Sequence, residues 1–248
     1  MTFRTLIAAI FVGASLMSNA VQSADIVVFS TISCKEALIE LVPEFEHSSG
    51  HKVNITYGGG SVLSRQISTG TTGDLFIGPE EFSGALMQQG KLLAPTVFAR
   101  SGTGLAVRAG VPKPDISTPE KLKSVLLNAA KISYSAGASG INFVKIIKDL
   151  GIEDAIVAKR VTPRAAELVG AVVARGDADI AVQQISELLP VQGIQILDPL
   201  PPALQQIIQY GASPFAQSTQ SEVSRSFINF LRTEAARKVL RLKGLDPA

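Results

Sequence analysis

Two short stretches of the chain place a hydroxyl residue where a β-strand runs directly into a helix. In the first, the apolar run 26–29 leads through Ser33 into a helix-like segment; in the second, the run 53–57 leads through 58–61, three glycines and a serine. A helix N-terminus carries unpaired N–H groups and the positive end of the helix dipole, so it binds anions without needing a cation. The two stretches therefore predict an anion site at the carboxyl ends of neighbouring strands. Ser33 with Glu36 also fits a capping box, which needs no ligand.

Three further positions are candidates for the same site because of where they stand. Ser139 opens a helix expected to end near Leu150, and Gln183 ends a strand expected over 179–183. Arg164 stands in the first turn of a helix predicted over 163–175, where a cation opposes the helix dipole. A role in binding would explain this local conflict.

Composition excludes several other functions. The chain has 23 basic and 21 acidic residues, a near-neutral balance that argues against nucleic acid or an acidic membrane as partner. The single cysteine, Cys34, excludes an intramolecular disulfide. The two histidines, His47 and His51, lie in a polar connection and are expected on the solvated surface, so we expect no metal site and no cofactor.

The N-terminus has the pattern of a secretory signal peptide. Arg4 precedes the apolar run 6–16, and small residues up to Ala20 suit cleavage. We therefore predict a signal peptide over 1–20 and a mature protein in the periplasm. An uncleaved anchor is the alternative, although the apolar run is well below the ~20 residues of a membrane span.

Strand-like and helix-like segments alternate along the chain, which predicts an α/β fold with largely parallel sheets. Length alone would permit one domain, but the pattern favours two lobes, with crossings near 102–104 and 190–193. Each lobe would be a mainly parallel sheet flanked by helices. The predicted bounds are 25–103 plus 190–248 for lobe I and 104–189 for lobe II. Such an arrangement places a cleft at the carboxyl ends of strands.

Three blocks of the sequence, 28–33, 63–70 and 73–77, resemble the periplasmic molybdate-binding proteins, the solute receptors of ABC importers. The likeness runs more weakly through the rest of the chain. It implies the two-lobed architecture of type II periplasmic binding proteins, closing as a monomer on a small anion held by neutral donors. It also implies an inner-membrane ABC permease as partner.

The resemblance also implies ligand contacts, which can be carried over by position. They fall on Ser33, on Gly60 with Ser61 directly after it, near Ser139, on Ala165 beside Arg164, and on Gln183. The family presents a second hydroxyl where this chain has Gly60, and a tyrosine where it has Gln183, and it uses no cation where this chain has Arg164. An arginine fork suits a planar carboxylate. We therefore expect a small di- or tricarboxylate to bind better than molybdate.

A second interpretation is an enzyme. Aconitate isomerase, which interconverts trans- and cis-aconitate, resembles the same receptors. Its proton shift needs a general acid/base and stabilisation of a developing carbanion. The candidate proton carriers, each weakly supported, are Cys34, Lys35, Tyr134 and Glu187. The sequence favours the receptor and leaves the isomerase open.

Overall fold

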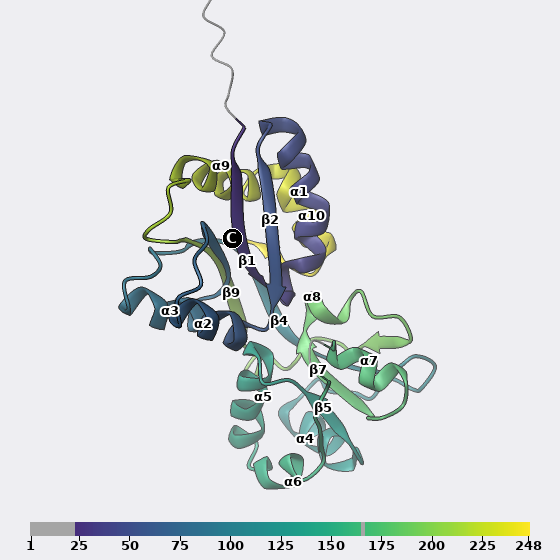
Figure 1. Ribbon diagram of the computed structural model, residues 1–248. Helices are drawn as coiled ribbons and strands as arrows, with labels where there is room; N and C mark the ends of the chain where they lie inside the picture. Colours follow the sequence, from purple (N-terminus) through teal and green to yellow (C-terminus); the bar gives the residue numbers. More distant parts are fainter. Residues whose placement is uncertain (1–22, 165–166) are drawn as a thin grey trace, which may run out of the picture.

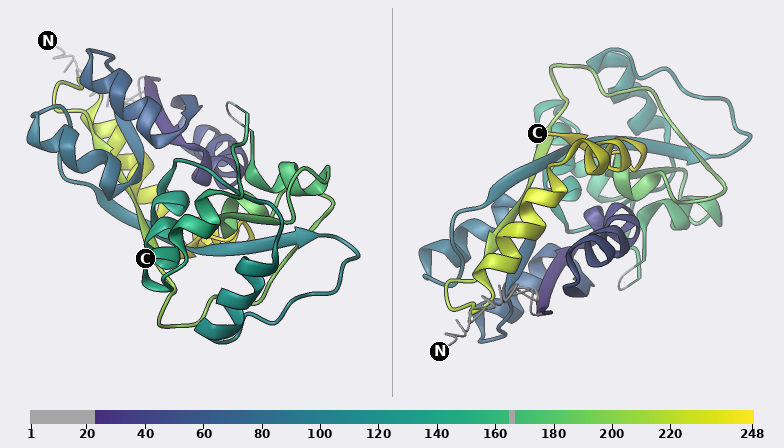
Figure 2. Two further views of the ribbon diagram at one scale, coloured as in Figure 1. Left: turned by 90° about the horizontal axis from the view of Figure 1, so that it is seen from below. Right: turned by 90° about the horizontal axis from the view of Figure 1, so that it is seen from above.

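The computed structural model describes residues 23–164 and 167–248, which form two groups of strands and helices joined through one long strand (Figures 1 and 2). That strand is β4 (Thr96–Arg108). Its first half pairs with β9 (Ile207–Pro214), and its second half pairs with β7 (Ile180–Gln184) and β8 (Ile194–Ile196). The predicted signal peptide, 1–20, lies outside the described residues.

The first group is a sheet with the strand order β2-β1-β3-β9-β4. Its N-terminal strands, which pair in parallel, are β1 (Asp25–Thr31), β2 (Lys52–Gly58) and β3 (Leu75–Pro79). The strands β9, β4 and the short β10 (Asp246–Pro247) add antiparallel pairs. The sheet therefore has a parallel core and an antiparallel flank.

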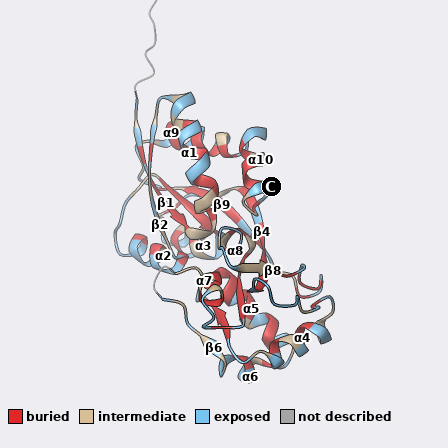
Figure 3. Cartoon of the chain, turned by 90° about the vertical axis from the view of Figure 1, so that its right-hand side faces the viewer, coloured by how far each residue is buried: buried red, intermediate tan, exposed pale blue. Residues whose placement is uncertain are grey.

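Helices cover both faces of this sheet because successive strand residues point to opposite sides. Val28 belongs to a core cluster beneath α1 (Lys35–Ser49), α9 (Ser221–Leu231) and α10 (Glu234–Leu242). Its neighbour Phe29 packs on the other face with α2 (Gly60–Ser68) and α3 (Glu80–Gln88). Both strand residues are buried, and Figure 3 shows buried residues along the central strands of the sheet.

The second group repeats this plan on a smaller scale. The parallel strands β5 (Ile132–Tyr134), β6 (Arg160–Val161) and β7 are joined by the antiparallel β4 and β8. One face packs on α4 (Pro119–Asn128), α5 (Ala138–Asp149) and α6 (Glu153–Val157); the other packs on α7 (Val169–Ala174) and α8 (Ile185–Leu188). The predicted α/β architecture is thus confirmed.

The chain crosses between the groups at two adjacent places. One crossing is in β4 near Thr103, whose N–H donates to the Gln206 carbonyl at 3.4 Å. The lobe bounds predicted from the sequence stay a prediction. Because β8 pairs with β4 inside the second group, and Leu197 and Leu204 pack in its core, we propose that the chain returns near Gln205 rather than near Pro190.

No helix within 23–164 and 167–248 has both the length and the apolar character needed to cross a bilayer.

Candidate functional site

A cavity of about 510 Å³ is lined by residues of both groups. Its first side, which we call the neutral wall, consists of 31–33, 58–62, Pro79 and Phe82. Its second side, the charged wall, consists of 135–139, 160, 162–164, 167–168, 183–184 and 187. The cavity thus lies where β1, β2, β5 and β7 end, which is the usual place for ligands in open α/β sheets.

Several helices begin at this cavity. The 3₁₀ turn η1 (Ile32–Cys34) leads into α1, α2 begins at Gly60, and α5 begins at Ala138. None of these three starts has a side-chain hydrogen bond at its N-cap. By contrast, α4 and α10 begin away from the cavity and are capped by the Thr118 and Thr233 hydroxyls. The N–H groups at the cavity are therefore free of side-chain caps, although α6 and α9 show that uncapped starts occur elsewhere.

Ser33 lies inside η1 on the neutral wall. The predicted capping box with Glu36 is wrong, because the N-cap positions are Thr31 for η1 and Cys34 for α1, and neither makes a side-chain cap. The extended backbone continues through Thr31 before the turn begins, which moves Ser33 past the cap position. Its hydroxyl lies close enough to the Glu187 carboxylate, across the cavity, to lower the pKa of that carboxyl.

Two glycines are required by close packing at this site. A Cβ on Gly60 would lie 2.3 Å from ring carbons of Phe82, and one on Gly140 would lie 1.9 Å from the Ser135 carbonyl oxygen. Gly60 and the exposed Ser61 line the neutral wall, whereas the buried Ser139 lines the charged wall. Because neither position carries a Cβ, the start of α2 can approach the Phe82 ring and the start of α5 can approach the Ser135 carbonyl.

Arg164 lines the cavity from an exposed position, but the helix predicted over 163–175 is wrong in its first half. Helix α7 begins only at Val169. The Arg164 N–H donates to Glu167 Oε2 at 3.0 Å, and the Glu167 N–H donates to the Arg164 carbonyl. These two backbone groups of Arg164 are thus bonded to Glu167 and not to a helix. Arg164 therefore does not oppose a helix dipole, and the local conflict expected from the sequence is absent. Ala165 lies outside the described residues.

Arg160 is a second cation at the cavity, and the sequence reasoning missed it. Its guanidinium lies 4.4 Å from the centre of the Tyr134 ring and donates to the Tyr134 carbonyl at 3.3 Å. On the same wall, Arg175 holds the Glu167 carboxylate at 2.5 Å, and this hydrogen bond lowers the pKa of Glu167. Arg160 lies in the two-residue strand β6, and Arg175 lies eight residues after Glu167. Neither position follows a sequence pattern that predicts a binding site, and only the fold brings these side chains to one wall.

Gln183 is buried at the end of β7, as its predicted place in the strand implied. Its Oε1 accepts a hydrogen bond from the Val169 N–H at 2.8 Å, which gives α7 its first-turn partner. Its amide group also lies near the Glu187 carboxyl and lowers the pKa of that group. The side chain therefore connects two elements of the charged wall.

Glu187 lies in the first turn of α8 and lines the same wall. Burial raises the pKa of this carboxyl to about 7, against the opposing effect of hydrogen bonds from the Gln184 N–H, Gln183 and Ser33. Among the described residues, no lysine or arginine lies within ion-pair distance of it. It is a carboxylic acid that changes its charge near neutral pH.

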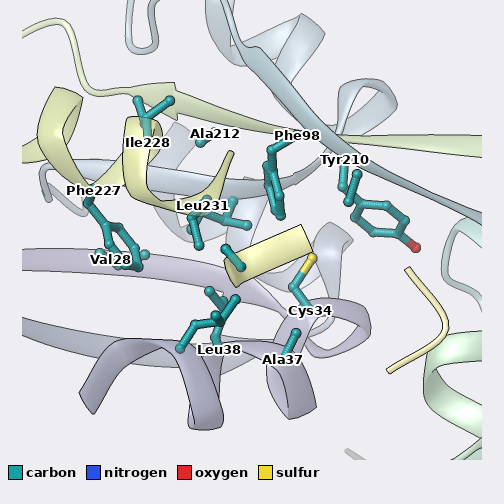
Figure 4. Packing of buried hydrophobic residues seen from close by; sticks show 14 of the residues in the cluster. Val28, Cys34, Ala37, Leu38, Phe98, Tyr210, Ala212, Phe227, Ile228 and Leu231 are labelled. Carbon is teal, nitrogen blue, oxygen red and sulfur yellow. The ribbon is translucent and has the colours of Figure 1, made fainter. Parts of the chain in front are cut away.

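Of the four candidate proton carriers, only Glu187 lines the 510 Å³ cavity. Cys34 is packed in the core of the first group (Figure 4), and burial raises the pKa of its thiol far above neutrality. Tyr134 is buried in the core of the second group, and burial raises the pKa of its hydroxyl. Lys35 lines a separate cavity of about 200 Å³. His47 and His51 line neither cavity.

Two groups joined by paired crossings, with one cavity where their strands end, define the architecture of a periplasmic binding protein. Residues 26–246 match the family model of bacterial extracellular solute-binding proteins, and the chain belongs to that family.

Two curated relatives and one solved structure show how close the likeness is. The chain is 37% identical over 152 residues to an aconitate isomerase from a Pseudomonas species; this match covers 60% of the chain and only 57% of the relative. It is 25% identical over 232 residues to the molybdate-binding protein of Mycobacterium tuberculosis, covering 88% of the chain and 83% of the relative. The periplasmic molybdate-binding protein of Azotobacter vinelandii has the same fold, with a TM-score of 0.72 at 20% identity over 88% of the chain and 97% of that protein. The chain is thus a solute-binding protein of the ABC-transporter kind, related to molybdate binders.

Proposed function

We propose that the protein captures a small anion in the 510 Å³ cavity and presents it to an inner-membrane ABC permease from the periplasm. The observation that carries this proposal is the meeting of three uncapped helix starts, those of η1–α1, α2 and α5, on one cavity. Backbone N–H groups at such starts bind anions without a counter-ion. Ligand bound between the walls would favour a closed form by bridging them.

Ser33, Gly60, Ser61, Ser139, Arg164 and Gln183 are the proposed contacts, with Ala165 added from the family resemblance. The six described residues of this set line the cavity. Arg160 joins them as a second cation at the charged wall. Two arginines favour a ligand with more than one carboxylate, because a guanidinium holds a carboxylate through two parallel hydrogen bonds.

A thermal-shift screen of the protein without its predicted signal peptide, followed by calorimetry, tests this proposal. The panel comprises molybdate, tungstate, sulfate, trans-aconitate and citrate, in a buffer free of phosphate. A ligand present at about 100 times its Kd adds about 2.7 kcal/mol to the free energy of unfolding. Tight binding of molybdate with none of a carboxylate would overturn the ligand class, and binding of no anion would overturn the site.

The isomerase is a second candidate, favoured by Glu187 and by the aconitate isomerase relative. In this chemistry a carboxylate removes a proton from the methylene carbon of trans-aconitate, the electron pair shifts through the double bond, and the proton returns to the former alkene carbon. A carboxyl with a pKa of about 7 can both accept and return that proton. The helix starts and Arg164 would stabilise the negative charge that develops on the adjoining carboxylate.

A spectrophotometric assay with trans-aconitate tests the second candidate. If the protein is an isomerase, the Glu187→Ala variant shows no turnover, while calorimetry still detects binding of trans-aconitate to it. Tight binding without any turnover by the unmodified protein leaves only the receptor.

A further inference from the structure

Glu187 introduces an acidic group into a cavity otherwise suited to anions. Its carboxyl meets the Ser33 hydroxyl and the Gln183 amide, one from each wall. An ionised carboxylate at this place would repel a bound anion, because little water separates like charges in a partly enclosed cavity. A protonated carboxyl would instead offer an O–H donor in line with the N–H donors around it.

No neighbouring group compensates the charge of Glu187 directly. The thiol and the two phenols around it, Cys34, Tyr57 and Tyr210, have pKa values raised by burial and stay neutral near neutral pH. The charged side chains that line one of its two cavities are Lys35, Glu36, Arg160, Arg164 and Glu167. None of these cations forms an ion pair with Glu187 within the described part of the chain, and Glu167 is already held by Arg175.

The Tyr210 hydroxyl strengthens this view of the local environment. It is fully buried and has no hydrogen-bond partner among the described residues, and it points away from the apolar cluster around Cys34 (Figure 4). The charge on Glu187 acts on this phenol, so the two groups lie close together. On the side away from the cavity, the Glu187 carboxyl therefore faces buried groups that stay uncharged near neutral pH.

We propose that Glu187 holds the anion in its protonated form, donating a hydrogen bond to a ligand oxygen, so that anion capture takes up a proton from solvent whenever the free carboxyl is ionised. This inference rests on the proposed anion site and goes beyond it by naming the group that makes binding depend on protons. A bound anion disfavours ionisation of the carboxyl further. Proton uptake on binding is then greatest where the free carboxyl is mostly ionised.

The sign of the pH effect follows from linkage. The free carboxyl has a pKa of about 7, so it is largely protonated below that pH and binding costs no proton transfer there. Above it, the ionised form must first take up a proton, and affinity falls as pH rises. For a bound form that is fully protonated, affinity falls about 30-fold between about pH 6 and about pH 8.5.

Calorimetry across this pH range tests the inference, with trans-aconitate and molybdate as probes. Molybdate stays a dianion over this range, so the pH dependence of its binding reports on the protein. The last carboxyl of trans-aconitate is partly protonated at the acidic end, so its titrations are compared above about pH 7. Repeating the titrations in amine buffers of different ionisation enthalpy measures proton uptake directly on the unmodified protein. The matched variants are Glu187→Gln, which keeps a neutral donor, and Glu167→Gln, which changes the other carboxylate of the charged wall. We expect Glu187→Gln to bind with flat affinity and no proton uptake, and Glu167→Gln to keep the slope.

The outcomes separate this inference from the proposed function. Binding of a probe with flat affinity and no proton uptake by the unmodified protein overturns the role of Glu187 and leaves the anion site standing. A slope that survives in Glu187→Gln and vanishes in Glu167→Gln also overturns it. Binding of neither probe at any pH overturns the anion site, and the inference with it.

Discussion

The two walls of the cavity are built from different kinds of groups. Among the described residues, the neutral wall has backbone, glycines, Ser33 and Ser61 but no charged side chain, whereas the charged wall carries Arg160, Arg164, Glu167 and Glu187. Helix starts and hydroxyls can hold almost any small anion. Fixed charges distinguish anions by shape and by proton content. We infer that the neutral wall supplies affinity for small anions in general, and that the charged wall determines which anion is preferred.

The largest expected effect comes from forcing the charged wall out of place. In Gly140→Ala the new Cβ would lie 1.9 Å from the Ser135 carbonyl oxygen, so the 135–139 loop must move. We expect a loss of about 3 kcal/mol in the free energy of unfolding, together with loss of anion binding. Urea unfolding and calorimetry measure the two effects.

Gly84→Ala is the matched control for that substitution. Gly84 lies in α3, and a Cβ there meets no atom within 4 Å. The alanine should therefore add about 0.5–1 kcal/mol to stability through helix propensity. Equal behaviour of the two variants would mean that the Ser135 contact does not shape the cavity.

Removing one cation sharpens the comparison between the walls. Arg164→Ala should weaken trans-aconitate binding by about 1.5–3 kcal/mol, because a charged hydrogen bond is lost, and should affect molybdate less. Arg225→Ala is the control, since Arg225 lies on α9, away from the cavity, and pairs with Glu222 at 2.9 Å. Calorimetry with both anions on both variants measures the difference. Equal losses for the two anions would contradict selectivity by the charged wall.

The neutral wall should respond without regard to the anion. Ser33→Ala should weaken trans-aconitate and molybdate by a similar amount, about 1.5 kcal/mol, because one hydroxyl donor is lost to either ligand. Ser61→Ala asks whether the hydroxyl one residue after Gly60 also contributes. Ser68→Ala is the control from the other end of α2, where the hydroxyl bonds Gln89 at the surface. A loss for one anion alone would remove the proposed division of roles.

The sequence predicted the neutral wall better than the charged wall, and the reason is physical. A strand running into glycine or serine is a local signal, and it located the starts of η1–α1, α2 and α5. The helix predicted over 163–175 begins later than expected, at Val169, whose N–H bonds Gln183 from β7, while the Arg164 N–H bonds the Glu167 carboxylate. Hydrogen bonds between residues far apart in the chain produce no hydrophobic periodicity, so the sequence could not predict where α7 begins.

Burial and pairing explain the other differences. Glu187 was only a weak candidate because the rise in its pKa comes from tertiary burial, which no sequence pattern reveals. The apolar residues 104–107 are only part of a strand of 13 residues, β4. Its first half is interrupted by Arg100 and Ser101 and does not read as a buried strand, yet it pairs with β9 and links the two groups.

The smallest expected effect concerns helices that begin away from the cavity, and it tests whether only the helix starts at the cavity contribute to binding. Thr118→Ala and Thr233→Ala remove the caps of α4 and α10, whose hydroxyls accept from the Lys121 and Ala236 N–H groups at 3.3 Å each. Each should cost about 1 kcal/mol of folding free energy, because an orphan N–H loses its partner. Neither should change anion affinity, since both helices begin away from the cavity. A change in trans-aconitate affinity in either variant, measured at equal folded fraction, would mean that distant helix starts also act on the bound anion. The assignment of anion binding to the groups of the two walls would then be wrong.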